Sequence, residues 1–245
     1  MESPKSPTDS ITRTLVRSGP RRILRGVAIA AGVFIAFVLC TLWYVGVFGG
    51  NVRIVRPHQL YRSAQLTGAT LRHALKANKI GTVVNLRGAE TWDSKWKNET
   101  AVCRSLGVEH LDVALSATRL PPPSELRKLL HDFDTARYPV MVHCMGGADR
   151  TGLAVTIYLN IYQHVPLNHA EAEGLTLRYG HIAWSSSHAM DEFFDIYRHQ
   201  GAGMDLRSWI LHRYPSIYAR LVPAKPTITG PARSKLVPVR NGKAS

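Results

Sequence analysis

The stretch PVMVHCMGGADRTG, residues 139–152, decides how this chain folds. It opens with branched apolar residues that are typical of a short buried strand, and from Arg150 onward it continues as an apolar helical pattern. Between the two lie Cys144 and the glycines Gly146 and Gly147, which allow a backbone to curl and direct several N–H groups at one point. The N-terminus of the helix adds a partial positive charge there. The sequence therefore predicts an anion-binding loop between a strand and a helix, with a cysteine where the strand ends.

The ten residues from His143 to Gly152, HCMGGADRTG, match the pattern HCxxGxxRTG at every fixed position. This segment resembles the phosphate loop of cysteine-based protein tyrosine and dual-specificity phosphatases, and the resemblance extends from about residue 55 to about residue 200. A second segment, YRSAQ at residues 61–65 followed by IGTVVNLR at residues 80–87, is similar to the N-terminal part of bacterial and fungal members. The resemblance implies a phosphatase that uses neither a metal nor a cofactor.

Strand and helix patterns alternate along the chain up to the loop. This order predicts an α/β fold with a phosphatase-like, largely parallel central sheet flanked by helices. The expected strands cover residues 82–86, 108–115 and 139–144, and the expected helices cover residues 68–78, 90–106, 124–136, 151–163, 169–179, 187–200 and 205–213.

The formal charge of +14 is concentrated in the two ends of the chain. Residues 1–50 contain six Lys and Arg against two acids, and residues 221–245 contain five against none, so nine of the fourteen charges lie outside the middle. A nucleic-acid-binding fold would place basic residues among aromatic ones on one surface, and the middle of the chain has no such patch. We therefore expect no nucleic-acid partner. The eleven histidines show no metal-ligand spacing, and three cysteines at positions 40, 103 and 144 make no disulfide framework.

A stretch of 23 residues without charge, residues 26–48, predicts a transmembrane helix, because it is long enough to cross a hydrocarbon core of about 30 Å. Trp43 and Tyr44 suit an interfacial position. A cleaved signal peptide is the alternative, although the apolar run exceeds the roughly 7–15 residues of a signal core. We expect a disordered basic N-terminus over residues 1–25, a phosphatase domain over residues 51–220 and a disordered basic tail over residues 221–245.

Basic residues on the N-terminal side of the apolar segment predict the orientation of the chain. Six Lys and Arg precede the segment, so the positive-inside rule places the N-terminus in the cytoplasm and the domain in a periplasmic or extracellular space. One observation favours the opposite orientation, since a catalytic Cys144 would have to stay reduced in an oxidising compartment.

The resemblance implies a role for each loop residue. Cys144 is the expected nucleophile, and Arg150 is expected to bind two phosphoryl oxygens. The hydroxyl of Thr151 is expected to donate a hydrogen bond to the cysteine sulfur. His143 supports the backbone around the nucleophile. The expected phosphate-binding residues are Met145, Gly146, Gly147, Ala148, Asp149 and Arg150.

The general acid is the open point of the mechanism, because the segment Ser116–Pro121, where family members usually carry an aspartate, contains no carboxylate. Two candidates remain, Asp112 at the end of a strand and Asp149 inside the loop. Asp149 resembles a bacterial subgroup with the loop HCxxGKDRTG, which acts on phosphotyrosine and phosphoinositides, although Ala148 replaces the lysine of that subgroup. We favour Asp149 and keep Asp112 as the alternative.

Two arginines outside the loop, Arg62 and Arg87, could steady the loop or the substrate. Surface exposure or structural salt bridges are the preferred interpretation for both.

Two functions are consistent with these patterns. The first is a membrane-anchored phosphomonoesterase that removes phosphate from tyrosine, or from serine, threonine or a phosphoinositide, through a phosphocysteine intermediate. Its partners would be a phosphorylated protein or lipid and the membrane that holds residues 26–48. The second is a pseudophosphatase that binds phosphorylated ligands without turnover. This alternative is suggested by the absence of a general acid from the segment Ser116–Pro121. The presence of Cys144, Arg150 and Thr151 favours the enzyme.

Overall fold

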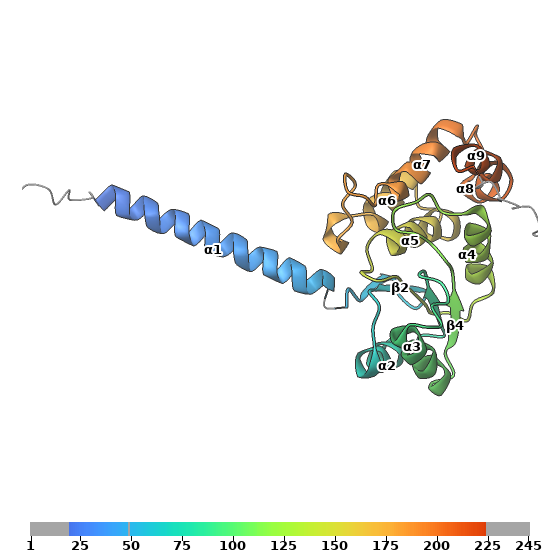
Figure 1. Ribbon diagram of the computed structural model, residues 1–245, viewed down its shortest axis with the longest axis horizontal. Coiled ribbons are helices and arrows are strands. Elements are labelled where there is room, and N and C mark those ends of the chain that lie inside the picture. Colours follow the sequence, from blue (N-terminus) through green and yellow to red (C-terminus); the bar gives the residue numbers. More distant parts are fainter. Residues whose placement is uncertain (1–19, 49, 224–245) are drawn as a thin grey trace, which may run out of the picture.

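A computed structural model describes residues 20–48 and 50–223, and Figure 1 shows a long separate helix followed by a domain of strands and helices. The strands are β1 (Arg53–Arg56), β2 (Leu60–Ser63), β3 (Thr82–Asn85), β4 (Glu109–Asp112) and β5 (Val140–His143). The α-helices are α1 (Pro20–Phe48), α2 (Gly68–Ala77), α3 (Ser94–Ser105), α4 (Pro123–Thr135), α5 (Asp149–Tyr162), α6 (Leu167–Gly174), α7 (Ala189–Gln200), α8 (Leu206–Ser208) and α9 (Tyr214–Leu221). A 3-10 turn, η2 (Leu177–Tyr179), and a π-helical turn, η3 (Trp209–Arg213), complete the described elements.

The five strands form one sheet in the order β1-β2-β5-β3-β4. The strands β2, β5, β3 and β4 run parallel, whereas β1 pairs antiparallel with β2 at one edge. The strand that precedes the loop, β5, lies in the centre, between β2 and β3. This confirms the predicted α/β fold with a largely parallel sheet, and it places Cys144 at the carboxyl end of the central strand, where parallel sheets carry their sites.

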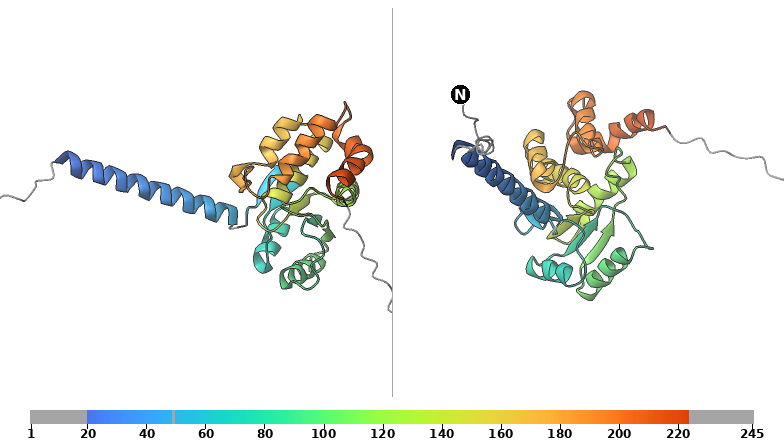
Figure 2. Two further views of the ribbon diagram at one scale, coloured as in Figure 1. Left: turned by 45° about the horizontal axis from the view of Figure 1, so that its top comes forward. Right: turned by 60° about the vertical axis from the view of Figure 1, so that its left-hand side comes forward.

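Two apolar cores cover the two faces of the sheet, because alternate residues of a strand point to opposite sides. Val83 and Met141 face a smaller cluster with α2 and α3. Val84, Val140 and Val142 face the larger cluster, which α4, α5 and the C-terminal helices complete. Figure 2 shows these two helical layers from further directions.

Most predicted helices are present with shifted ends. The helix expected from residue 90 begins at Ser94, because Asp93 caps it by accepting a hydrogen bond from the Lys95 backbone at 2.9 Å. The helix expected over 169–179 ends at Gly174 and is followed by η2, and the helix expected to stop at 213 continues through the π turn to Leu221.

The hairpin of β1 and β2 is absent from the sequence-based prediction. Each strand has only four residues, and three of their eight residues are arginines, so neither shows the apolar alternation of a strand. All four residues of β2 are nevertheless buried.

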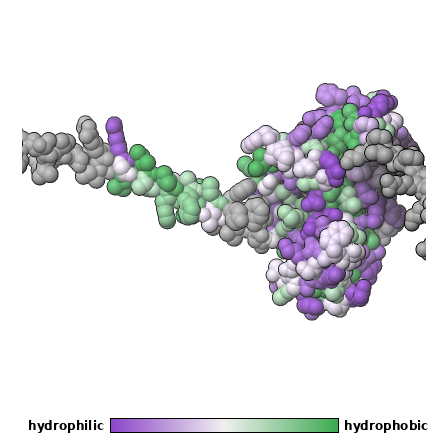
Figure 3. All heavy atoms as spheres, in the orientation of Figure 1, coloured by the Kyte–Doolittle hydropathy of each residue, from purple (hydrophilic) through white to green (hydrophobic). Residues whose placement is uncertain are grey.

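The apolar helix α1 stands apart from the domain. It begins at Pro20, so residues 20–25 are helical and the expectation of disorder up to residue 25 is wrong for them; proline suits the first turn of a helix. Its span Leu24–Thr41 has a mean hydropathy of 2.1 and none of it is buried, which makes it long and apolar enough for a membrane span or a signal sequence (Figure 3). The predicted disorder of residues 1–19 and 224–245 falls outside the described residues, as do the side chains of Trp43 and Tyr44.

Candidate active site

The glycine-rich loop connects β5 to α5 and folds against the end of β2. Cys144 follows directly after β5 and is only 3% exposed. Gly147 has φ +70°, and a Cβ at this position would lie 2.6 Å from the Ser63 carbonyl oxygen and 2.7 Å from the Ala64 nitrogen. Only glycine fits this backbone, because both the positive φ and the close approach of β2 exclude a side chain.

The backbone carbonyls of the loop are hydrogen-bonded on its outer side by groups from distant parts of the chain. The Gln65 backbone N–H donates to the Met145 carbonyl at 3.2 Å, and the amide of Asn51 donates to the carbonyls of Gly146 and Gly147 at 3.2 and 3.3 Å. The next carbonyl, of Ala148, accepts from the first turn of α5. The outer bonds fix the orientation of these peptide units.

The inner side of the loop consequently presents donors. Within the described part of the chain, the backbone N–H groups of Met145, Gly146, Gly147 and Ala148 donate to no acceptor. They lie directly before α5, whose N-terminus adds positive potential. A curled run of N–H groups at a helix N-terminus is a binding site for an anion such as a phosphoryl group.

Two side chains expected in the site share this pattern of unused donors. Arg150 donates through Nη1 to the Leu115 carbonyl at 3.3 Å, and its Nε is buried without a partner among the described residues. The hydroxyl of Thr151 is likewise buried and unpaired there. Buried polar groups are normally hydrogen-bonded, so both groups fit a bound ligand or the cysteine sulfur.

Asp149, the favoured acid, contacts a histidine that the sequence reading did not single out. The Asp149 carboxylate lies 2.8 Å from Nδ1 of His181, and Nε2 of His181 lies 3.0 Å from the Asp191 carboxylate on α7. Burial lowers the pKa of His181, but the hydrogen bond to Asp149 and the charges of both aspartates outweigh it and raise that pKa above its ordinary value. The imidazole therefore bridges two carboxylates as a cation more readily than a free histidine does.

Asp112, the alternative acid, lies at the end of β4 and is hydrogen-bonded there. Its carboxylate accepts hydrogen bonds from Asn85 Nδ2 at 2.7 Å and from Trp96 Nε1 at 3.0 Å. The register pairs Asn85 with both Asp112 and His143, so a whole strand separates Asp112 from the strand that leads to Cys144. Both hydrogen bonds end on Oδ1 and fix this carboxylate on β4, which β3 separates from the strand before the loop.

Residues 46–166 match the profile of the tyrosine phosphatase family. This part of the chain belongs to the tyrosine phosphatase family. The protein is therefore a phosphatase of the cysteine-based superfamily. None of the curated protein sequences compared with the chain matches it significantly.

Similar solved structures include P. aeruginosa TpbA, with 25% identity over 60% of this chain and 84% of that one and a TM-score of 0.46. A variant of TpbA in complex with phosphotyrosine is 24% identical over 62% and 91% of the two chains, with a TM-score of 0.45. The core catalytic domain of the PP-IP phosphatase SIW14 from S. cerevisiae, in complex with citrate, is 18% identical over 64% and 94%, with a TM-score of 0.48.

The signature histidine of this phosphatase is held by a buried glutamate. His143 Nδ1 lies 3.3 Å from the Cys144 carbonyl oxygen, and its Nε2 lies 2.8 Å from the Glu99 carboxylate. The same oxygen of Glu99 lies 2.8 Å from His110 Nε2. Burial raises the pKa of Glu99, but the charges and hydrogen bonds of His143 and His110 outweigh it and lower that pKa to about 2.

Arg62 differs most from its sequence-based interpretation. The expectation of a surface or salt-bridged role is wrong, because Arg62 is fully buried and donates to the carbonyls of Gly147 at 2.9 Å and Gly174 at 3.0 Å. Its guanidinium lies 3.9 Å from the ring centre of Tyr179, and burial lowers its pKa to about 10. Arg62 thus remains charged at neutral pH and steadies the loop from behind.

Arg87, in contrast, is salt-bridged as expected. It pairs with Glu90 and with Asp93, and it also donates to the side chain of Gln65.

In the described residues, no group of three or more His, Cys, Asp or Glu side chains is arranged to hold a metal ion.

Four residues of the site's surroundings were missed by sequence reasoning: Asn51, Glu99, His181 and Asp191. Their partners lie between 10 and 128 residues away along the chain, and no local pattern marks them as buried. The YRSAQ segment, residues 61–65, pointed to Arg62 but contains none of these four residues.

Proposed function

We propose that this phosphatase is a membrane-anchored phosphomonoesterase that hydrolyses phosphotyrosine, and also phosphoserine, phosphothreonine or phosphoinositides, through a phosphocysteine intermediate. The observation that carries the proposal is the loop itself. Its N–H groups, and the Nε of Arg150 that is buried without a partner among the described residues, provide donors for a phosphate dianion next to Cys144. Retention of Cys144, Arg150 and Thr151 in this arrangement favours turnover over a pseudophosphatase.

The first step transfers the phosphoryl group to the protein. The Cys144 thiolate attacks phosphorus, a sulfur–phosphorus bond forms, and the bond from phosphorus to the substrate oxygen breaks with its electron pair on that oxygen. Arg150 can bind two equatorial oxygens with its planar fork, and the loop N–H groups bind the rest of the developing charge. Arg62 adds a second positive charge behind the loop, because burial lowers its pKa only to about 10.

The leaving oxygen needs a proton, and we assign the role of proton donor to Asp149. Asp149 begins α5 next to Arg150, whereas Asp112 lies on β4, which β3 separates from the strand that leads to Cys144. The bridge from His181 to Asp191 fixes the orientation of Asp149 and offers a route for its proton. Asp149 thus donates a proton to the leaving oxygen in the first step and accepts a proton from water in the second.

The second step releases phosphate. A water molecule attacks phosphorus, the sulfur–phosphorus bond breaks, and the thiolate of Cys144 is regenerated. The hydroxyl of Thr151, which is buried beside the loop without another partner among the described residues, is suited to donate to the leaving sulfur.

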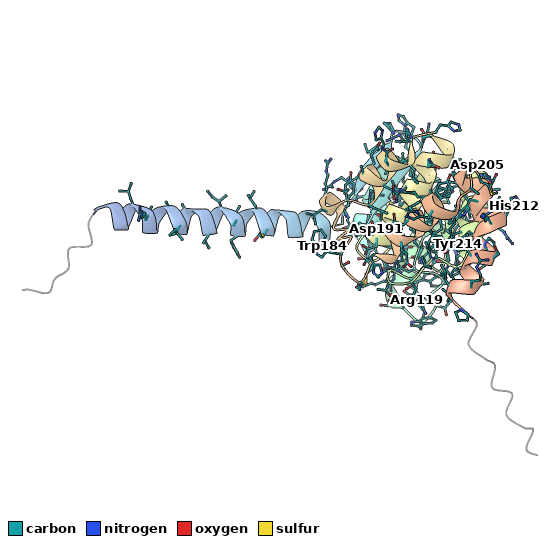
Figure 4. The ribbon with its side chains drawn as sticks, turned by 90° about the horizontal axis from the view of Figure 1, so that it is seen from above. Arg119, Trp184, Asp191, Asp205, His212 and Tyr214 are labelled. Atoms are coloured by element: carbon teal, nitrogen blue, oxygen red, sulfur yellow. The ribbon has the colours of Figure 1, made fainter. Side chains whose placement is uncertain are left out.

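The anchor is assigned to α1, within the predicted span of residues 26–48. None of its apolar span is buried, and such a surface is stable when lipid covers it. A signal sequence remains the alternative. Trp184, 85% exposed, lies on the side of the domain from which α1 extends (Figure 4), a position that suits a membrane interface. With the N-terminus in the cytoplasm, the domain would face the periplasm or the extracellular space.

The test uses the full chain in detergent with para-nitrophenyl phosphate and EDTA. This leaving group needs little help from an acid, so we expect metal-independent turnover in the wild type. Cys144→Ser should abolish turnover and retain phosphate binding. A wild-type chain that binds phosphate without turnover would support the pseudophosphatase, and full activity in Cys144→Ser would contradict the nucleophile.

A further inference from the structure

The junction between the apolar helix and the phosphatase domain enters the active-site scaffold. Asn51 lies three residues after the end of α1 at Phe48, and only 2% of it is exposed. The preceding residue, Gly50, accepts a hydrogen bond from the Ala64 backbone at 2.8 Å. Gly50 thus lies against the end of β2, and Asn51 lies between the phosphate loop and η2.

The side chain of Asn51 is buried against three backbone carbonyls. Its Nδ2 lies 3.2 Å from the Gly146 oxygen, 3.3 Å from the Gly147 oxygen and 3.1 Å from the Tyr179 oxygen. Three acceptors around one atom identify that atom as the amide nitrogen, since an oxygen there would repel all three. The backbone of Asn51 has φ +45°, a conformation that asparagine tolerates better than most residues.

These contacts orient the peptide units that bind the anion. A peptide unit whose carbonyl points outward toward Asn51 must direct the N–H on its other side inward. The carbonyls of Gly146 and Gly147 belong to the same peptide units as the N–H groups of Gly147 and Ala148. Without the Asn51 amide, these buried carbonyls lose a donor, and turning inward toward solvent would place their negative ends where phosphate binds.

We propose that Asn51 is a positioning residue that holds the phosphate loop in its anion-binding conformation, so that the junction with α1 forms part of the phosphatase site. The inference rests on the proposed phosphate-binding function of the loop. Arg62 assists from the same side through the Gly147 carbonyl, but it comes from β2, whereas Asn51 belongs to the segment that follows the anchor.

Two substitutions of Asn51 test the proposal in the full chain, kept in detergent. Asn51→Gly removes the amide and suits the positive φ. Asn51→Asp keeps the shape and removes both donors, so it serves if the glycine variant unfolds. Asn160→Ala is the matched control, because the Asn160 amide donates to the Val165 carbonyl at 3.0 Å at the opposite end of α5 from the loop.

The measurements are the calorimetric affinity for inorganic phosphate, kcat/KM for para-nitrophenyl phosphate, and the melting temperature. We expect both Asn51 variants to bind phosphate at least about tenfold more weakly, the change produced by the net loss of about one hydrogen bond. Their kcat/KM should fall by at least as much. Asn160→Ala should melt at a similarly reduced temperature while its phosphate affinity stays within about twofold of wild type.

Phosphate affinity within twofold of wild type in both Asn51 variants would overturn the proposal, whatever their melting temperatures. Equal losses of affinity in Asn160→Ala would also overturn it, because the effect would then be one of general stability. A wild-type chain that binds phosphate without hydrolysis would contradict the proposed function alone, and the Asn51 comparison would still be decided by the affinities. A wild-type chain that binds no phosphate would contradict both.

Discussion

Replacing Glu99 by glutamine should weaken the fold and should do so in a pH-dependent way. Glu99 lies on α3 with only 1% of its surface exposed, and one of its oxygens lies 2.8 Å from both His143 and His110. The two histidines hold the pKa of Glu99 at about 2, against an ordinary value of 4.5. Glutamine keeps the shape and one acceptor oxygen but removes the charge.

The magnitude follows from the difference between the two pKa values. At neutral pH it corresponds to about 3 kcal/mol of the free energy of unfolding. Because the pKa is lower in the folded state, this stabilisation is fully present above about pH 4.5 and is lost as the pH falls toward 2. About half of it should remain at pH 3. For a domain of this size, a loss of about 3 kcal/mol lowers the melting temperature by about 6–12 °C.

The assay is urea unfolding of the full chain in detergent, followed by tryptophan fluorescence at pH 7 and pH 3. Glu192→Gln is the control, since Glu192 and His188 form an exposed pair at 3.8 Å and should contribute less than about 0.5 kcal/mol. We expect the difference between wild type and Glu99→Gln to shrink between pH 7 and pH 3. A difference that is the same at both pH values, or no larger than that of the control, would show that the charge of Glu99 does not stabilise the fold.

Three further predictions concern the loop and its neighbours. Asp149→Asn should reduce the rate on phosphotyrosine at least about tenfold more than the rate on para-nitrophenyl phosphate, in line with the size of general acid catalysis; equal losses in steady-state assays would argue against an acid. Gly147→Ala should lose at least about 2 kcal/mol of stability and its phosphate binding, because its Cβ would meet the backbone of β2 and φ is +70°, whereas Gly146→Ala meets nothing within 4 Å and should fold normally; calorimetry and melting curves compare the two. The raised pKa of His181 stabilises the fold below about pH 6.5 and loses this effect as the pH rises through the folded value, so His181→Gln should destabilise the protein more at pH 6 than at pH 8.5 in urea unfolding.

The part of the fold that could be predicted from sequence is the part with local signals. The apolar residues of β5 and the glycines after Cys144 mark the loop within a few positions. The regular apolar spacing of Leu71, Ala74 and Leu75 marks α2 in the same way. The helix that follows the loop was expected close to where α5 lies, and Arg150 is at its start.

The remainder depended on contacts between distant segments. The strand β2 contains the fully buried Arg62, and an arginine inside a strand indicates an exposed position unless its acceptors are known. Those acceptors are carbonyls at Gly147 and Gly174. Asn51 and Glu99 are buried for the same reason, because each has partners provided by the loop or its flanking strand. Polar residues of this kind have no periodic pattern, so their positions could not be predicted.

In the proposed mechanism, Cys144 carries the phosphoryl group during turnover. The most direct measurement is a rapid denaturing quench of the full chain during a single turnover of a phosphotyrosine peptide labelled with 32P, followed by proteolysis and mass spectrometry. We predict one labelled phosphate per chain on the thiol of Cys144, and none in Cys144→Ser. Release of labelled phosphate without any label on Cys144 would contradict the account.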